Sequence, residues 1–265
     1  GAMILMLLTL VFSSEVLAKT HTTTASQKSH LTKASNKQVS SKQEYSRNSA
    51  KSSSLPDLRK YPSGTPRKKA FLRTVMPYIT SQNAAITAER NWLISKQYQG
   101  QWSPAERARL KDIAKRYKVK WSGNTRKIPW NTLLERVDII PTSMVATMAA
   151  AESGWGTSKL ARNNNNLFGM KCMKGRCTNA PGKVKGYSQF SSVKESVSAY
   201  VTNLNTHPAY SSFRKSRAQL RKADQEVTAT AMIHKLKGYS TKGKSYNNYL
   251  FAMYQDNQRL IAAHM

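Results

Sequence analysis

The sequence is short of acidic residues and of cysteine, and both shortages restrict what the protein can be. Its 265 residues include 43 Lys and Arg but only 13 Asp and Glu, so the formal net charge is +30. A charge of this size favours an anionic polymer or surface as the partner. The two cysteines, Cys172 and Cys177, have neither histidine nor carboxylate nearby and cannot complete a zinc site. We therefore expect no metal and no cofactor.

Several motifs that mark common enzyme and binding classes are also missing. No G-x-S-x-G, H-E-x-x-H, P-loop or G-x-G-x-x-G pattern is present, so serine hydrolysis, zinc proteolysis and nucleotide chemistry lack a site. No helix-turn-helix, zinc-finger or RNP-like signature accompanies the charge, so we expect no specific nucleic-acid binding. Nothing after residue 18 reaches the roughly 18 consecutive apolar residues of a transmembrane helix. We expect a soluble monomer.

Residues 3–18 form an apolar run of the size of a secretory h-region. Val16 and Ala18 occupy the −3 and −1 positions of an A-x-A-like cleavage site, whereas Glu15 and the lack of a basic n-region are unusual for a signal. The pattern predicts export to the periplasm or cell envelope, with a buried helix or an apolar tail as the alternative. Residues 1–2 are interpreted as a cloning remnant.

The expected state of the two cysteines follows from export. In an exported chain, a disulfide between Cys172 and Cys177 that closes a small hairpin is the expected state. The alternative is a cysteine nucleophile acting with His207 or His234, although nothing in the sequence orients such a pair.

Composition divides the chain into four parts. Residues 1–18 hold the remnant and the signal-like segment, and residues 19–65 form a disordered basic linker rich in Ser, Thr and Lys. Residues 66–130 are expected to be a helical N-terminal extension, and residues 131–265 the main domain. The fold class is mainly α, with a Gly-rich stretch at 167–190 that predicts a small β-hairpin lobe.

Apolar periodicity and capping signals locate the helices. In addition to the helices of the extension, we expect one helix to begin near Pro129, a second to run from Pro141 to Glu152 and a third to run from Tyr246 to Ile261. Within the extension, Pro77 is expected to kink or break a helix.

Acidic residues at three positions are assigned to helix starts. Residues 103–106 predict a capping box that opens a helix to about Tyr117, and Ser192 with Glu195 predicts another. Asp224 is expected to cap a further helix. Carboxylates at these places stabilise free N–H groups and the helix dipole, which leaves them a structural role.

Glu152 is the leading candidate for chemistry. Met144, Met148 and Glu152 are spaced i, i+4, i+8, so the carboxylate shares the stripe that its helix turns toward the core. Partial burial raises a carboxyl pKa, as a general acid near neutral pH requires. The alternative is a carboxylate at the edge of the core that is paired with Lys or Arg.

The residues around Glu152 suit a saccharide. Aromatic side chains offer flat faces and hydroxyls, and the amides of residues 163–166 offer donors and acceptors. The aromatic candidates are Trp155, Phe168, Tyr187, Tyr239, Tyr246 and Tyr249. For any one of them, a place in the core is the alternative.

Four motifs in a fixed order resemble the glucosaminidase domain of glycoside hydrolase family 73. They are ESGWGTS at 152–158, NLFGMK at 166–171, YSQF at 187–190 with ESVSAY at 195–200, and GYST at 238–241 with Tyr246. The resemblance covers residues 131 to 261. It implies a lysozyme-like α fold with a β-lobe and cleavage of the β-1,4 bond after N-acetylglucosamine in peptidoglycan.

The resemblance also implies roles for individual residues. It makes Glu152 the general acid, and Asn166 and Phe168 match the segment that lines the family's cleft. Tyr239 and Tyr246 match C-terminal tyrosines that position the N-acetyl sugar. The implied partners are peptidoglycan glycan strands, and the charge adds anionic envelope surfaces.

One departure from the family bears on mechanism. Several relatives have a second acid in the β-lobe, but residues 171–190 contain no Asp or Glu. Glu152 then has no obvious partner, either at the roughly 5 Å of retaining enzymes or across the wider gap of inverting ones. We expect substrate assistance, in which the 2-acetamido oxygen attacks the anomeric carbon and Tyr239 or Tyr246 orients it. Glu195 as a distant base is the alternative.

Three other functions remain open at this point. A muramidase or lytic transglycosylase on the same fold would cut the neighbouring bond. A non-catalytic wall-binding module would depend on charge, and its binding would fall with salt. A basic nucleic-acid binder would have no use for Glu152 or the tyrosines.

Overall fold

The computed structural model describes residues 55–172, 175, 177, 179–236 and 243–265. The signal-like segment at 1–18, most of the predicted linker and Tyr239 lie outside these residues. Within them, no helix combines the length and the apolar character needed to cross a bilayer.

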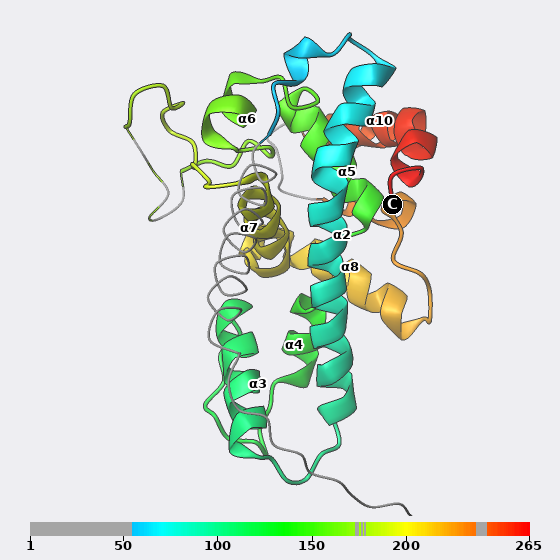
Figure 1. The fold of residues 1–265 in the computed structure, drawn as a ribbon. Helices are drawn as coiled ribbons and strands as arrows, with labels where there is room; N and C mark the ends of the chain where they lie inside the picture. The colour runs from blue at the N-terminus through cyan, green and yellow to red at the C-terminus, as the bar shows by residue number, and fades with distance from the viewer. Residues whose placement is uncertain (1–54, 173–174, 176, 178, 237–242) are drawn as a thin grey trace, which may run out of the picture. The chain divides into compact units, whose positions relative to one another are not determined.

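The first described element belongs to the core although the sequence placed it in the linker. It is a 3-10 helix, η1 (Leu58–Lys60), which precedes the long helix α2 (Thr65–Lys96) (Figure 1). The side chain of Leu58 is fully buried. The folded part therefore begins upstream of residue 66, because one apolar side chain of this segment packs into the core.

Helix α2 continues through Pro77, so the break considered at this residue does not occur. Proline removes one helical N–H group and its hydrogen bond. The apolar side chains of Val75, Met76 and Ile79 beside it are buried, as are Phe71 and Leu72 before it and Ile86 and Leu93 after it. Packing on this buried side holds the helix together across the missing bond.

The next helices are α3 (Pro104–Arg116), α4 (Trp130–Arg136), α5 (Thr142–Ser153) and α6 (Lys159–Asn164). The capping box predicted before α3 is confirmed, because Ser103 and Glu106 each accept a hydrogen bond from the other's backbone N–H. The helix predicted to reach Glu152 is confirmed as α5, which ends one residue later.

The remaining elements are α7 (Val193–Thr206), η2 (Pro208–Tyr210), α8 (Ser211–Lys222), α9 (Ala229–Met232), η3 (Ile233–Lys235) and α10 (Lys244–Ala262). The prediction that Asp224 caps the helix after it is wrong. Asp224 has a left-handed backbone with φ 52°, and its N–H bonds to the carbonyl of Arg221, so it follows the end of α8. Thr228 caps α9 instead, by accepting a hydrogen bond from Ala231 N at 3.1 Å.

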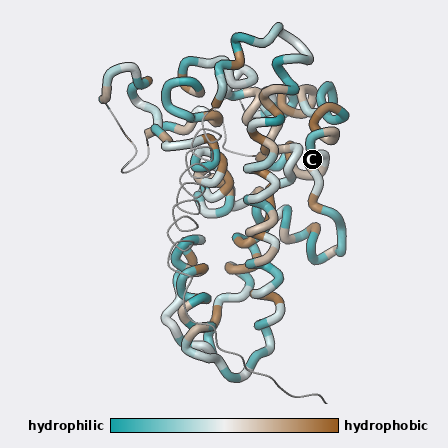
Figure 2. Tube along the Cα trace, viewed as in Figure 1, coloured by the Kyte–Doolittle hydropathy of each residue, from teal (hydrophilic) through white to brown (hydrophobic). Residues whose placement is uncertain are grey.

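Helix α5 lies in the core of the described chain. It packs against α2 of the N-terminal extension and against α10, and α7 also packs against α2. Residues 144–150 of α5 are all buried. Figure 2 shows hydrophobic positions recurring along α2 and the helices beside it. The extension therefore supplies part of the core around α5.

A buried ionic cluster fixes the segment that leads into α5. Asp138 is 1% exposed and accepts hydrogen bonds of 2.8 and 2.9 Å from Arg221. Arg90 of α2 lies 3.6 Å from the same carboxylate, and the fully buried Arg217 donates to the carbonyl of Glu135 at 2.8 Å. Burial opposes the ionised form of Asp138, but the hydrogen bonds from Arg221 and the nearby cations outweigh it and lower its pKa.

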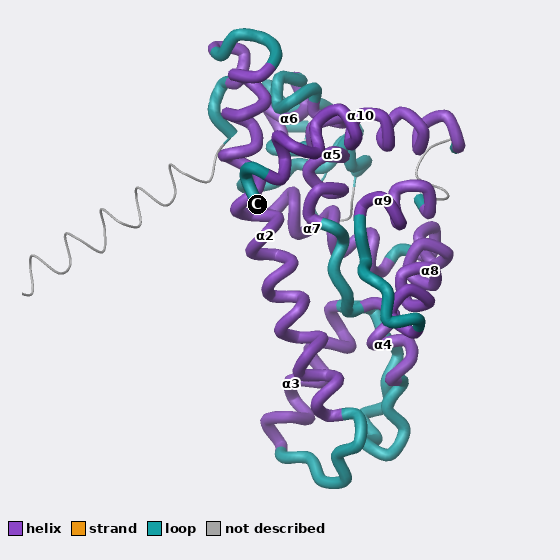
Figure 3. The backbone as a smooth tube through the Cα atoms, turned by 90° about the vertical axis from the view of Figure 1, so that its right-hand side faces the viewer, coloured by secondary structure: helices purple, strands orange, loops and turns teal. Residues whose placement is uncertain are grey.

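The predicted β-hairpin lobe is not confirmed. Between residues 167 and 190 the described residues contain one antiparallel bridge, Lys171 to Tyr187, and no strand. Figure 3 shows helices and loops throughout the part of the chain that it describes. A mainly helical structure is consistent with the lysozyme-like α fold, and the segment that carries the bridge is mostly irregular.

Candidate active site

Glu152 lies at the C-terminal end of α5, immediately before a left-handed turn. Gly154, Trp155 and Gly156 have φ values of 56°, 55° and 78°. Trp155 N donates to the carbonyl of Ala150 at 2.9 Å, and Gly156 N donates to Ser153 Oγ at 2.8 Å. These bonds close the helix and reverse the chain directly after the carboxylate.

Two segments from elsewhere in the chain reach the Glu152 carboxylate. The hydroxyl of Tyr246, on α10, donates a hydrogen bond to Glu152 Oε1. On the other side is Gly169, where an added Cβ would lie 3.3 Å from Glu152 Oε2. The side chain of Glu152 is partly buried. Its two oxygens therefore face α10 and the 166–170 loop.

The negative charge of Glu152 also contributes to the pKa of Tyr210. Tyr210 follows α7 in the short helix η2 and is 7% exposed. Burial, with a smaller contribution from the negative charge of Glu152, raises the pKa of Tyr210 to about 12. Tyr210 is therefore a neutral phenol close to the carboxylate at any physiological pH.

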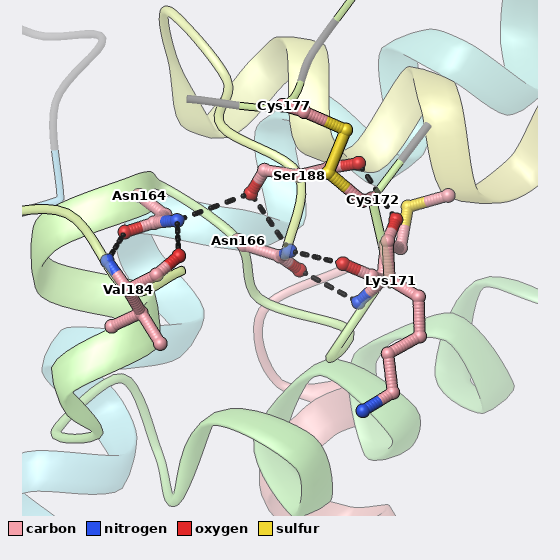
Figure 4. Close-up of a disulfide and its surroundings, with 8 residues drawn as sticks. Asn164, Asn166, Lys171, Cys172, Cys177, Val184 and Ser188 are labelled. Carbon is pink, nitrogen blue, oxygen red and sulfur yellow. Dashed lines mark hydrogen bonds between the residues drawn. A yellow bond between two sulfur atoms is a disulfide. The ribbon is translucent and has the colours of Figure 1, made fainter. Parts of the chain in front are cut away.

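Asn166 holds the loop that carries Gly169. Its Oδ1 accepts from Met170 N at 3.0 Å, and its Nδ2 donates to the carbonyls of Met170 and Ser188 at 2.9 and 3.0 Å (Figure 4). Asn166 is 1% exposed. Its amide is thus committed to the protein backbone, and in this structure it fixes the loop instead of facing a cleft.

Phe168 is a core residue in this structure. Its ring stacks on that of Tyr200 with a centroid distance of 4.1 Å and an interplanar angle of 6°. The Tyr200 hydroxyl in turn donates to Met148 Sδ, one helical turn before Glu152, at 3.4 Å. Phe168 is 2% exposed and therefore offers little surface to a glycan. Its packing instead supports the 166–170 loop and the end of α5.

Trp155 is partly buried and is held by α2. The rings of Phe71 and Trp155 form a T-shaped pair with a centroid distance of 5.6 Å and an interplanar angle of 81°, and Lys68 Nζ lies 5.0 Å from the centroid of the Trp155 ring. Trp155 lies in the turn that follows Glu152, and its side chain packs against helix α2 of the N-terminal extension.

Tyr187 lies on the irregular segment, opposite Lys171. Lys171 Nζ donates to the Tyr187 hydroxyl at 3.1 Å and lies 4.3 Å from the centre of its ring. The neighbouring residue Cys172 is joined to Cys177 by a disulfide, which Figure 4 shows beside the Asn166 network.

Glu195 is held at the start of α7. Ser192 caps this helix by accepting from Glu195 N at 3.1 Å, but the Glu195 carboxylate bonds Ser191, to its N–H at 2.6 Å and its hydroxyl at 2.7 Å. In a capping box, the Glu195 carboxylate would accept a hydrogen bond from the N–H of Ser192. In the structure it accepts from Ser191 instead, one residue upstream. Glu195 also lines a pocket with residues of α7 and with Lys118.

Metal-binding groups do not gather at this site. In the described part of the chain, no three His, Cys, Asp or Glu residues lie close enough together to hold an ion.

Sequence reasoning missed two contacts of the site and one support of the helix that carries it. Tyr210 has no motif or periodic spacing that links it to Glu152. Gly169 was recognised within NLFGMK, but its contact with the carboxylate depends on the three-dimensional turn. The Asp138 cluster joins residues from three distant segments, and no local pattern marks it.

Comparison with known protein families agrees with the geometry. Residues 129–259 match the Glucosaminidase family model, which is described as mannosyl-glycoprotein endo-beta-N-acetylglucosaminidase. No solved structure was found to match this chain. The matched stretch contains Glu152, Gly169, Tyr210 and Tyr246. Residues 129–259 therefore form a domain of the glucosaminidase family, and the protein is a glycoside hydrolase that acts on glycan as an endo-β-N-acetylglucosaminidase.

Proposed function

We propose that the protein hydrolyses the β-1,4 bond after N-acetylglucosamine in peptidoglycan, with Glu152 as the general acid. The observation that carries this proposal is the position of Glu152 within the family domain, at a helix end, between the Tyr246 hydroxyl and Gly169. A partly buried carboxylate that is aligned by a phenol is suited to protonate a leaving oxygen.

The reaction that we propose needs one carboxyl group of the protein. Glu152 gives its proton to the glycosidic oxygen as the bond from that oxygen to the anomeric carbon breaks. The oxygen of the substrate's 2-acetamido group bonds to the anomeric carbon from the opposite face. Water then attacks this carbon and displaces the acetamido oxygen, while the Glu152 carboxylate accepts the proton of the water. Two inversions at one carbon give retention of configuration.

The positions of other acids support this scheme over a pair of carboxylates. Asp138 is buried among arginines, Glu195 is bonded to Ser191, and Glu135 lies 3.9 Å from Arg214. Residues 171–190 contribute no acid. Each of these three carboxylates already has a structural task in its own part of the domain.

The tyrosines contribute by holding groups in place. Tyr246 is near enough to Glu152 to orient both the acid and the acetamide of a sugar bound beside it. Tyr239, which lies outside the described residues, is proposed to contact the same sugar. Trp155 and Tyr187 are proposed to flank the glycan, whereas Asn166 and Phe168 are proposed to act by shaping the 166–170 loop.

The choice of peptidoglycan rests on charge as well as on family. Helix α3 and the loop after it expose many cations, including Arg107, Lys111, Lys115, Lys118 and Lys120. Such a surface favours anionic polymers of the cell envelope, and the attraction weakens as salt rises. With the signal-like residues 3–18, this supports export to the periplasm or cell envelope, where we propose that the protein acts as a monomer.

Digestion of purified sacculi tests the proposal. We expect mass spectrometry to find reducing N-acetylglucosamine ends, NMR to find retained anomeric configuration, and Glu152→Gln to abolish release. Glu195→Gln should keep most of the activity. Reducing or anhydro muramic ends would indicate a muramidase or lytic transglycosylase, and an active Glu152→Gln protein would remove Glu152 as the acid.

A further inference from the structure

The segment upstream of the family domain packs directly on the turn behind Glu152. A Cβ added to Gly156 would lie 2.5 Å from Leu58 Cδ1 and 3.1 Å from Phe71 Cδ2. Any side chain at residue 156 would therefore have to displace Leu58 and crowd Phe71. Leu58 and Phe71 are both fully buried, and both lie well before residue 129, where the family match begins.

Lys68 ties the same turn to α10. Its ammonium lies 5.0 Å from the centre of the Trp155 ring and donates to Asn257 Oδ1 at 2.8 Å. Helix α10 also carries Tyr246, the hydrogen-bond partner of Glu152. The turn at 154–156 and the Tyr246 helix are thus joined through one side chain of α2.

The upstream segment is itself held in place. Arg67 Nε donates to the carbonyl of Leu58 at 3.1 Å, and Arg67 Nη2 donates to that of Tyr61 at 3.0 Å. These two bonds fix η1 against the first turn of α2. A segment bound in this way acts as a fixed support for the turn and does not behave as a movable lid.

We propose that Leu58, Phe71 and Lys68 are positioning residues for Glu152. They hold the Gly154–Gly156 turn so that the end of α5 presents its carboxylate to Tyr246 and to the space beside Gly169. The proposal rests on Glu152 being the general acid. A displacement of about 1 Å at a catalytic group can reduce the rate about a hundredfold. On this proposal, residues upstream of the family domain help to position the catalytic group.

The test compares two buried leucines that precede the family domain, Leu58 and Leu110, in the whole 265-residue chain. Leu58→Ala truncates a side chain that packs on the turn, whereas Leu110→Ala makes the same truncation on α3, which lies apart from α5 in Figures 1 and 3. Lys68→Met removes the link to Asn257 and keeps the apolar stem. Leu58→Met serves as the conservative variant that should restore the packing.

The measurements are kcat and KM on soluble uncross-linked peptidoglycan strands and on N-acetylglucosamine oligomers, well below the Tm of every variant. Hydrogen exchange of the peptide at 154–158 reports on the turn without substrate. We expect Leu58→Ala and Lys68→Met to lower kcat about tenfold or more, with KM nearly unchanged and faster exchange of this peptide. Leu110→Ala should lower Tm alone, and Leu58→Met should recover most of kcat.

Equal kcat for Leu58→Ala and Leu110→Ala would overturn the proposal, as would faster exchange at 154–158 with unchanged kcat. If Leu58→Ala does not fold, Lys68→Met decides by the same criteria. Glu152→Gln is assayed in parallel, because activity in that variant overturns the proposed acid, whereas an inactive Glu152→Gln beside a fully active Lys68→Met overturns the positioning role alone.

Discussion

The hydroxyl of Tyr246 donates a hydrogen bond to Glu152 Oε1, although the two residues are 94 positions apart and lie on different helices. This bond joins the last described helix to the residue that we propose as the general acid. It also brings together the first and the last of the four family motifs, which lie farthest apart in the sequence.

Removing this hydroxyl should slow the reaction without unfolding the protein. In Tyr246→Phe the ring remains and the bond to Glu152 is lost, so we expect kcat to fall roughly tenfold to a hundredfold. The matched control is Tyr249→Phe, because Tyr249 is 54% exposed and its ring lies 6.4 Å from that of Tyr246. Steady-state kinetics on soluble strands separate the two variants, and an equal loss in both would argue against a specific role for Tyr246.

A side chain at residue 169 should interfere with the acid. The Cβ of Gly169→Ala would lie 3.3 Å from Glu152 Oε2, at a φ of 65° that favours glycine. We expect a loss of about 1 kcal/mol or more of stability and a fall in kcat beyond what the stability change explains.

Gly182→Ala separates these two effects. Gly182 has a φ of 80°, but its added Cβ would meet no atom within 4 Å. It therefore carries the backbone strain without the contact to Glu152. Denaturant unfolding should give similar losses for the two variants, and only Gly169→Ala should lose activity. If Gly182→Ala loses as much activity, the crowding of Glu152 is not the cause.

The Asp138 cluster should dominate the stability of the segment before α5. Asp138→Asn leaves Arg90, Arg217 and Arg221 without their carboxylate, and we expect a loss of about 3–5 kcal/mol at neutral pH. The pKa of Asp138 is lowered by folding, so its contribution is present above the ordinary value of 3.8 and is lost as pH falls below it.

Urea unfolding at several pH values checks this prediction. The stability difference between wild type and Asp138→Asn should shrink as pH drops below about 3.8, and it should be constant above pH 5. Asp112→Asn, which removes an exposed partner of Arg116, should change stability little at any pH. A small effect of Asp138→Asn at pH 7 would contradict the assignment of the cluster as a main support.

Titration of Tyr210 should report on the charge of Glu152. Burial is the larger cause of its raised pKa of about 12, and the Glu152 carboxylate is the smaller. Glu152→Gln should therefore lower the pKa of Tyr210 without returning it to 10. The stabilising contribution of the neutral phenol is present below pH 10 and is lost as pH rises toward 12.

Carbon-13 NMR of labelled tyrosines measures this shift directly. Tyr117 is the internal control, because burial with a contribution from Glu89 raises its pKa to about 12. Its titration should be the same in wild type and in Glu152→Gln. An unchanged Tyr210 in that variant would show that the two groups do not interact.

Local signals made much of the fold predictable. The Ser103 capping box and the helix ending beside Glu152 depend on neighbouring residues, and the structure agrees with them. The last helix is also present, but it begins at Lys244, before the predicted Tyr246. Asp224 shows the limit of such signals. Asp is favoured both at N-caps and in left-handed turns, and the choice depends on Thr228, which caps the helix four residues later.

The site was predictable in its centre and less so in its surroundings. Glu152 could be identified from its stripe and motif. The burial of Asn166 and Phe168 could not, because it depends on Ser188, Tyr200 and the path of the 166–170 loop. Leu58 looked like linker because the apolar residues around it lie in a short stretch interrupted by proline and glycine. Its buried position exists only once α2 and the turn after Glu152 have come together.

The bond between Lys68 and Asn257 spans 189 residues and has a consequence for how the chain folds. Helix α2 leaves the ribosome long before α5, α7 and α10, which its apolar side needs as partners. Contacts so distant in sequence make folding slow and leave apolar surface exposed in the meantime. A nascent or C-terminally truncated chain therefore holds α2 and α5 without their final neighbour. Such chains should depend strongly on chaperones until α10 has been synthesised.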